Sequence, residues 1–261
     1  MNRVQQLKFC RSDFVLWRQQ VVAKTNTSPY AGNYTFRLSP PLATNNALTD
    51  GSGFGTMTVS TKGLIKWTAV LANQAKSNQL GVLIDPPSLQ GQATVLKGGR
   101  WSFYVPSKSG DALTGEMTFT TNGTFAGDVK WFAPGFVGLT NLATQTNQNV
   151  KMNGARYTPA TSAPPFNWTN GVLTISGGGL AEPIVTPVQW QTNGAFLISS
   201  NPHHIQLFVT NATGFIGGSF TPPGSNTLAR LRGAVLQSSN SAAGYVPHLP
   251  RHGGFELRRA P

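Results

Sequence analysis

Two carboxylates near the middle of the chain are the best candidates for catalytic chemistry. Glu116 and Asp128 lie on either side of Asn122-Gly123, a dipeptide that favours a tight turn between antiparallel strands. Paired carboxylates hydrolyse glycosidic bonds when one is the acid and the other the nucleophile or base, with ~5–9.5 Å between them. We therefore take Glu116 and Asp128 as candidate catalytic residues of a polysaccharide hydrolase.

The register of this hairpin decides how the two carboxylates lie. A two-residue loop at 122–123 would place apolar side chains on both faces, whereas a three-residue loop at 122–124 gathers them on one face. These apolar residues are Met117, Phe119, Phe125, Val129 and Trp131. Burial favours the second register, in which Glu116 faces Lys130 and Asp128 lies diagonally from Glu116 at about 7–8 Å. The simpler alternative is an exposed cross-strand Glu–Lys pair without a catalytic role.

Aromatic side chains are a second resource, because an exposed ring can stack on a sugar ring. The candidate ligand-binding residues are Trp67, Trp101, Lys130, Trp168 and Trp190. The four tryptophans stand in or beside expected strands, and burial in the core is the alternative for most of them. A sparsely charged surface rich in Asn, Gln and Thr suits a neutral polysaccharide or a cell-envelope glycan.

Other catalytic chemistry finds little support. Cys10 is the only cysteine, which excludes an intramolecular disulfide and a cysteine-based zinc site. His203 and His204 would point to opposite sides of an extended chain, while His248 and His252 lie in a proline-containing tail. The sequence lacks G-x-S-x-G, P-loop and H-E-x-x-H motifs. We expect no metal and no cofactor; a metal site assembled from both histidine regions is the alternative.

The charge pattern argues against nucleic acid as a specific partner. The formal net charge is +12, from 20 Lys and Arg against 8 Asp and Glu. Residues 25–250 hold 12 basic and six acidic residues, so half of the excess belongs to the two ends. Nucleic-acid binders gather basic residues on one face or in a run, and here they are scattered. The low charged fraction, 11%, with 29 Gly and 18 Pro, also excludes a coiled coil or helical bundle.

The expected elements are short strands. From Tyr30 onward, alternating apolar and polar residues recur at roughly the 8–12-residue spacing of sandwiches and barrels, separated by Gly, Asn and Pro. Residues 33–38, 54–59 and 101–105 are examples. Helical periodicity is absent after Lys24. The sequence predicts an all-β protein, an antiparallel sandwich or barrel.

Four segments are expected along the chain. They are a basic N-terminal extension with a short helix at 1–28, a first β half at 29–139, a polar linker at 140–165 and a second β half at 166–261. The extension lacks the apolar core of a signal peptide, and no stretch approaches the ~20 apolar residues of a transmembrane helix. Residues 121–127 echo residues 210–217 with one insertion, which favours two pseudo-repeated halves.

Several short motifs carry a resemblance that covers residues 30–261. They lie at 32–35, 53–59, 99–105, 113–119, 233–237 and 253–257. The series resembles a β-rich domain that recurs near the C-termini of large secreted or surface proteins of environmental bacteria. The resemblance implies a β fold and a place outside the cell or on its surface within a longer parent, but no activity. The chain departs from the pattern at Glu116, where an apolar residue is common.

These features favour a non-catalytic extracellular β module for attachment or glycan binding. The alternative is a small polysaccharide-active hydrolase that uses Glu116 and Asp128. Oligomeric state does not follow from the sequence.

Overall fold

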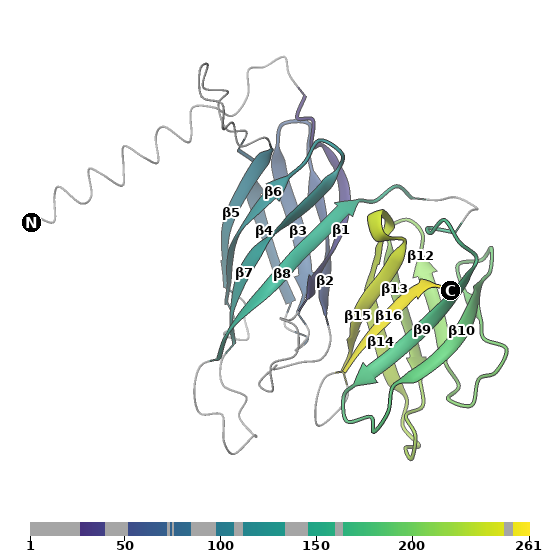
Figure 1. Cartoon of the computed structure of the whole chain (residues 1–261). Coiled ribbons are helices and arrows are strands. Elements are labelled where there is room, and N and C mark those ends of the chain that lie inside the picture. The colour runs from purple at the N-terminus through teal and green to yellow at the C-terminus, as the bar shows by residue number, and fades with distance from the viewer. Residues whose placement is uncertain are drawn as a thin grey trace, which may run out of the picture.

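The chain folds into two antiparallel β-sheets that follow one another along the sequence (Figure 1). The computed structural model describes residues 27–39, 52–71, 74, 76–84, 98–106, 112–133, 146–159, 164–247 and 253–261. The prediction of an all-β fold is confirmed. The helix expected in the N-terminal extension falls outside the described residues.

The first sheet is an eight-stranded meander that closes almost completely into a barrel. Its strands are β1 (Gly32–Ser39), β2 (Gly53–Val59), β3 (Leu64–Val70), β4 (Lys76–Val82), β5 (Gly99–Pro106), β6 (Ala112–Phe119), β7 (Thr124–Ala133) and β8 (Thr146–Arg156). The last strand, β8, returns to pair with β1. Between β4 and β5, two backbone hydrogen bonds of 2.7 Å join Ile84 to Arg100 and complete the ring.

The second sheet repeats this plan, so the chain consists of two repeated halves. Its strands are β9 (Asn170–Gly177), β10 (Ile184–Trp190), β11 (Phe196–Leu197), β12 (Gln206–Thr210), β13 (Phe215–Phe220), β14 (Ala229–Leu236), β15 (Ser241–Val246) and β16 (Gly253–Arg259), with the 3-10 turn η1 (Gln237–Ser239) before β15. Here β16 pairs with β9. The weakest join lies between β11 and β12, where an isolated bridge connects Ala195 and Phe208.

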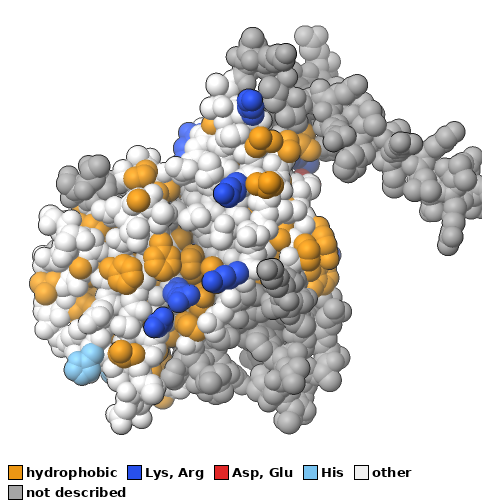
Figure 2. All heavy atoms as spheres, turned by 180° about the vertical axis from the view of Figure 1, so that it is seen from behind, with side chains coloured by type: hydrophobic (Ala, Val, Ile, Leu, Met, Phe, Trp, Pro, Cys, Tyr) orange, Lys and Arg blue, Asp and Glu red, His pale blue; other side chains and the backbone are white. Residues whose placement is uncertain are grey.

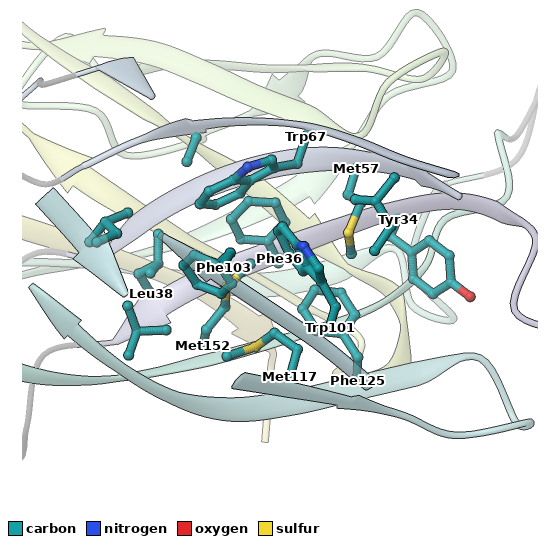
Figure 3. Packing of buried hydrophobic residues seen from close by; sticks show 14 of the residues in the cluster. Tyr34, Phe36, Leu38, Met57, Trp67, Trp101, Phe103, Met117, Phe125 and Met152 are labelled. Atoms are coloured by element: carbon teal, nitrogen blue, oxygen red, sulfur yellow. The ribbon is translucent and has the colours of Figure 1, made fainter. Parts of the chain in front are cut away.

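Period-two alternation explains why these segments are strands with a filled interior. In β3, the side chains of Ile65, Trp67 and Ala69 are buried and those between them are exposed. Figure 3 shows the buried residues of the first barrel packed against one another. The ring centroid of Trp101 lies 5.3 Å from that of Trp67 and 4.6 Å from that of Phe103. An eight-stranded barrel is just wide enough for side chains to fill it.

The two barrels pack against each other through β1 and β2 of the first and β14 and β15 of the second. Phe54, Ala234 and Tyr245 form a small buried cluster at this border, and the Phe54 and Tyr245 rings stack at 5.9 Å. Arg37 also forms an ion pair with Glu256 across it, at 3.3 Å. Apolar contact, stacking and charge pairing therefore hold the halves together.

The expected linker at 140–165 was assigned too broadly. Residues 146–156 form β8, which lies between β1 and β7 and completes the first barrel. Its buried positions, Val150 and Met152, follow the polar run 146–149, which hides the strand in the sequence.

The two echoing segments both make tight turns. Residues 121–127 turn from β6 into β7, and residues 210–217 turn from β12 into β13. The first turn follows the sixth strand of its barrel and the second follows the fourth. The local likeness therefore reflects turn chemistry at places that are not equivalent in the two halves.

Candidate functional site

The turn between β6 and β7 places the candidate carboxylates in a register different from the predicted one. The loop residues are 121–123, because Thr120 pairs with Thr124 and Gly123 has φ +84°. A three-residue hairpin loop needs a left-handed residue at its third position, and glycine adopts that conformation without strain. In the predicted 122–124 loop, Thr124 would have occupied that position. The apolar face was predicted correctly, but each residue of β6 pairs with a residue of β7 two positions earlier than predicted.

In the observed register, Glu116 stands directly opposite Asp128. The expected Glu116–Lys130 pair is wrong, because Lys130 faces Thr114. Glu116 instead forms an ion pair with Arg100 at 3.0 Å, and Asp128 forms one with Lys151 at 2.6 Å. The two carboxylate side chains are 49% and 74% exposed on the outer face of the barrel. Each carboxylate is thus already paired with a cation on a convex, hydrated surface.

The four candidate tryptophans lie inside the barrels. Trp67 and Trp101 are 1% exposed, and Trp168 and Trp190 are 6% exposed. Trp168 stacks on Phe166 at 4.4 Å and donates its indole N–H to the carbonyl oxygen of Asn240 at 2.7 Å. These rings fill the cores, which was the alternative interpretation, and none is placed to stack on a sugar at the surface.

The described residues form a hollow at one end of the second barrel. Its volume is about 790 Å³, and it lies where the loops β9–β10, β11–β12 and β13–β14 meet. It is lined by Gly178, Gly179, Leu180, Ala181, Glu182, Pro183, Ile184, Val185, Thr186, Pro187, Ser200, Pro202, His203, Ile205, Pro222, Pro223 and Ser225. The sequence alone did not reveal this site.

The short strand β11 opens this part of the barrel wall. It pairs only with Gln189 and Trp190 of β10, so the beginning of β10 borders the loop 198–205 instead of a strand. The Thr186 hydroxyl donates a long hydrogen bond to the Ser200 carbonyl, 3.5 Å away, across this gap. The loop 198–205 therefore takes the place that a longer β11 would occupy beside the beginning of β10.

The loops around the hollow are held in place by their own hydrogen bonds. The Asn201 side chain accepts a hydrogen bond from the Ile205 N–H at 2.6 Å and donates one to the Ile205 carbonyl at 2.9 Å. The Thr221 N–H donates to the carbonyl oxygen of His203 at 2.7 Å and ties this loop to the β13–β14 loop. Gly177–Gly179 turn the chain with φ values of +70°, +63° and +84°. The hollow is consequently largely preformed.

The chemistry of the lining is that of a neutral ligand site. Among the described residues, prolines and aliphatic side chains make up most of the lining, Thr186, Ser200 and Ser225 add hydroxyl groups, and Glu182 and His203 supply a carboxylate and an imidazole. Within the described part of the chain, no group of three His, Cys, Asp or Glu side chains could hold a metal ion. His248 and His252, which the alternative metal site required, are not among the described residues.

Comparison with known proteins assigns no function to this arrangement. No protein-family model and no curated protein matches the sequence. Among solved structures, a chain from the DUF3598 family of Nostoc punctiforme, a protein of unknown function, is similar over 88% of this chain and 94% of its own. The sequence identity is 11% and the TM-score 0.20, so the likeness carries no argument. The described residues include no helix with the length and hydropathy that crossing a membrane requires.

Proposed function

We propose that the chain is a non-catalytic binding module and that the hollow of the second barrel holds a neutral glycan. The preformed hollow carries this proposal. Its volume of about 790 Å³ falls within the ~300–1,000 Å³ of small-molecule sites. Because its loops are pinned by hydrogen bonds, little ordering entropy opposes binding.

The polar groups of the hollow support a sugar ligand. The Ser200 hydroxyl can both donate to and accept from a sugar hydroxyl, and the Thr186 hydroxyl, which donates to the Ser200 carbonyl, can still accept a hydrogen bond. Pro202, Pro222 and Pro223 offer apolar surface for the C–H face of a sugar ring, and their backbones lose little freedom on binding. Because Glu182 and His203 are the ionisable side chains of the described lining, the hollow has no cluster of like charges that would favour a charged ligand.

The outer-face carboxylates support a module better than a hydrolase. Hydrolysis by paired carboxylates needs the two groups on either side of a bound sugar, in a site that excludes bulk water and admits the one water that reacts. Glu116 and Asp128 lie side by side on a convex face, and Arg100 and Lys151 neutralise them. Exposed ion pairs of this kind are a common feature of sheet surfaces and stabilise them only slightly.

We also propose that the module acts outside the cell or at its surface as part of a longer protein. The short motifs at 53–59, 99–105 and 253–257, which resemble a domain of secreted and surface proteins, support this placement.

The experiment measures binding and turnover together. The full chain is titrated with cellohexaose, xylohexaose and chitohexaose by calorimetry, and each mixture is then analysed for shortened products. We expect saturable binding of at least one hexasaccharide and no products. Product release that Glu116→Gln abolishes would establish the hydrolase instead, and a failure to bind any of the three would contradict the glycan proposal.

A further inference from the structure

The outer face of β12, β13 and β14 carries a second concave feature, with a different chemistry. Its volume is about 370 Å³, and it is lined by Gln206, Phe208, Phe215, Gly217, Gly218, Ser219, Arg230, Leu231 and Arg232. It shares no lining residue with the hollow at the end of the barrel. Figure 2 shows hydrophobic and basic side chains next to each other on this side of the second barrel.

The strand register arranges these side chains in two rows. One row runs from Phe208 through Gly217 to Arg232. The neighbouring row runs from Gln206 through Ser219 to Arg230. Because alternate residues of a strand share a face at ~3.3 Å per residue, the rows lie about 6.6 Å apart.

Glycine at the centre of the first row creates the floor. A Cβ atom at Gly217 would come within 2.9 Å of the rings of both Phe208 and Phe215. The two ring centroids are 6.3 Å apart, and the Phe208 side chain remains 47% exposed. Because Gly217 has no side chain, the rings of Phe208 and Phe215 can lie against the sheet at this position, and the space above them stays open.

The two arginines at the edge of this floor carry uncompensated charge. Arg230 is exposed and Arg232 is half-buried, and no ion pair among the described residues includes either of them. Arg232 stands opposite Tyr245 in the register, a buried residue of the border between the barrels. A half-buried guanidinium without an acidic partner is complementary to an anion.

We propose that this face binds an acidic polysaccharide and holds one of its uronic acid residues. The apolar face of the sugar ring lies on Phe208, and its carboxylate pairs with Arg230 or Arg232. The planar guanidinium matches a carboxylate with two parallel hydrogen bonds. Gln206 and Ser219 stand beside Arg230 and supply the hydrogen bonds that sugar hydroxyls need.

A single-stranded nucleic acid fits this face less well. Its binding relies on a series of stacked bases along a basic groove. Here one ring, that of Phe208, is well exposed, and Phe215 is partly covered by the neighbouring Phe54 at 5.9 Å. The amide and hydroxyl row beside the arginines favours a ligand rich in hydroxyl groups.

The test follows fluorescein-labelled hexagalacturonate by anisotropy at low salt. The variants are Arg230→Gln and Phe208→Ala. The control is Arg259→Gln, which removes one positive charge from an exposed position of β16 in the same barrel. Loss of one charged hydrogen bond should weaken binding roughly tenfold or more in Arg230→Gln, and Phe208→Ala should weaken it similarly. Arg259→Gln should bind like the wild type.

Two further probes identify the chemistry. Methyl-esterified hexagalacturonate lacks the carboxylate charge and should bind much more weakly than the acid. A 20-residue oligothymidylate should not compete with the labelled sugar. Equal losses in all three variants, tighter binding of the oligothymidylate, or no binding of hexagalacturonate would each overturn the proposal. Filling the other hollow with Ser200→Trp should leave this binding unchanged, so the proposal stands or falls independently of the neutral glycan site.

Discussion

The hydroxyl of Thr35 in the first barrel donates a hydrogen bond of 2.5 Å to the carbonyl oxygen of Val235 in the second barrel. The bond is buried and joins residues 200 positions apart in the sequence. Close to it, the Tyr157 hydroxyl donates to the carbonyl oxygen of Asn211 at 2.7 Å. The border between the barrels is therefore specified by directed polar contacts as well as by apolar packing.

Replacing Thr35 by valine should destabilise the protein. The Thr35→Val change keeps the side-chain volume but leaves the buried Val235 carbonyl without this donor, which costs about 1–3 kcal/mol. Thr58→Val is the control, because the hydroxyl of Thr58 makes an exposed hydrogen bond to the Asn33 side chain. Calorimetry should show a lower free energy of unfolding for Thr35→Val and almost none of this loss for Thr58→Val. Equal stabilities would mean that the buried bond contributes nothing.

The contact between the barrels also depends on Gly214. Its φ is +70°, and an added Cβ would lie 2.8 Å from the Tyr157 ring and 2.9 Å from the Thr35 methyl group. Gly224 has nearly the same φ, +71°, with nothing near an added Cβ. Gly224→Ala should therefore cost only the backbone strain, about 1–2 kcal/mol, whereas Gly214→Ala should cost clearly more. Urea denaturation measures both, and equal losses would contradict the tight contact.

The paired carboxylates of the first barrel should be nearly dispensable. Glu116→Gln removes an exposed ion pair with Arg100, worth less than ~1 kcal/mol, and also removes a like charge opposite Asp128. We expect unfolding midpoints within about 2–4 °C of the wild type for Glu116→Gln and for Asp128→Asn. Glycan binding should not change in either variant. A large loss of binding in both would place the site on this face.

Stability should fall in alkaline solution. Burial raises the pKa of Tyr34, Tyr157 and Tyr245 above their ordinary value of 10.0, an effect that Arg156 opposes at Tyr34 and Arg232 at Tyr245. The unfolded chain loses these protons at lower pH, so the stabilisation is complete below pH 10 and is lost as the pH rises through the folded-state pKa values. Thermal denaturation between pH 8 and about 11 should show this decline.

Tyrosine variants identify the source of the alkaline decline. Tyr157→Phe should make the decline shallower because one buried phenol is removed. The exposed Tyr104 supplies the control, and Tyr104→Phe should keep the wild-type profile. If both variants followed the wild-type curve, the buried phenols would not be its cause.

The sequence predicted the strands and the buried faces well because both follow local alternation. Met117, Phe119 and Val129 are buried, as their period-two spacing required. The exact pairing of β6 with β7 was missed because it depends on the conformation of one residue, Gly123, and not on apolar spacing. β8 was missed because its first residues, 146–149, are polar.

The candidate sites were less predictable, because residues far apart in the sequence become neighbours only when the strands pair and each sheet closes. The lining residue Thr186 comes from β10, and Ser200 and Pro222 come from two separate loops; only the pairing of β9 with β16 and the shortness of β11 bring them to one end. Phe208 and Arg232 likewise become neighbours through the register of three strands. The three glycines at 177–179 and the prolines at 222–223 are turn-forming residues, but such residues alone do not show that the two loops meet.

The proposal of a neutral glycan site in the hollow of the second barrel is tested most directly by filling that hollow. Ser200 lines it, whereas its exposed neighbour Ser199 does not. Calorimetric titration with the hexasaccharide that binds the wild type would compare Ser200→Trp with Ser199→Trp, after thermal denaturation has shown that both variants are folded. We predict that Ser200→Trp abolishes binding and that Ser199→Trp retains it. Undiminished binding by a folded Ser200→Trp protein would contradict the assignment of the hollow as the glycan site.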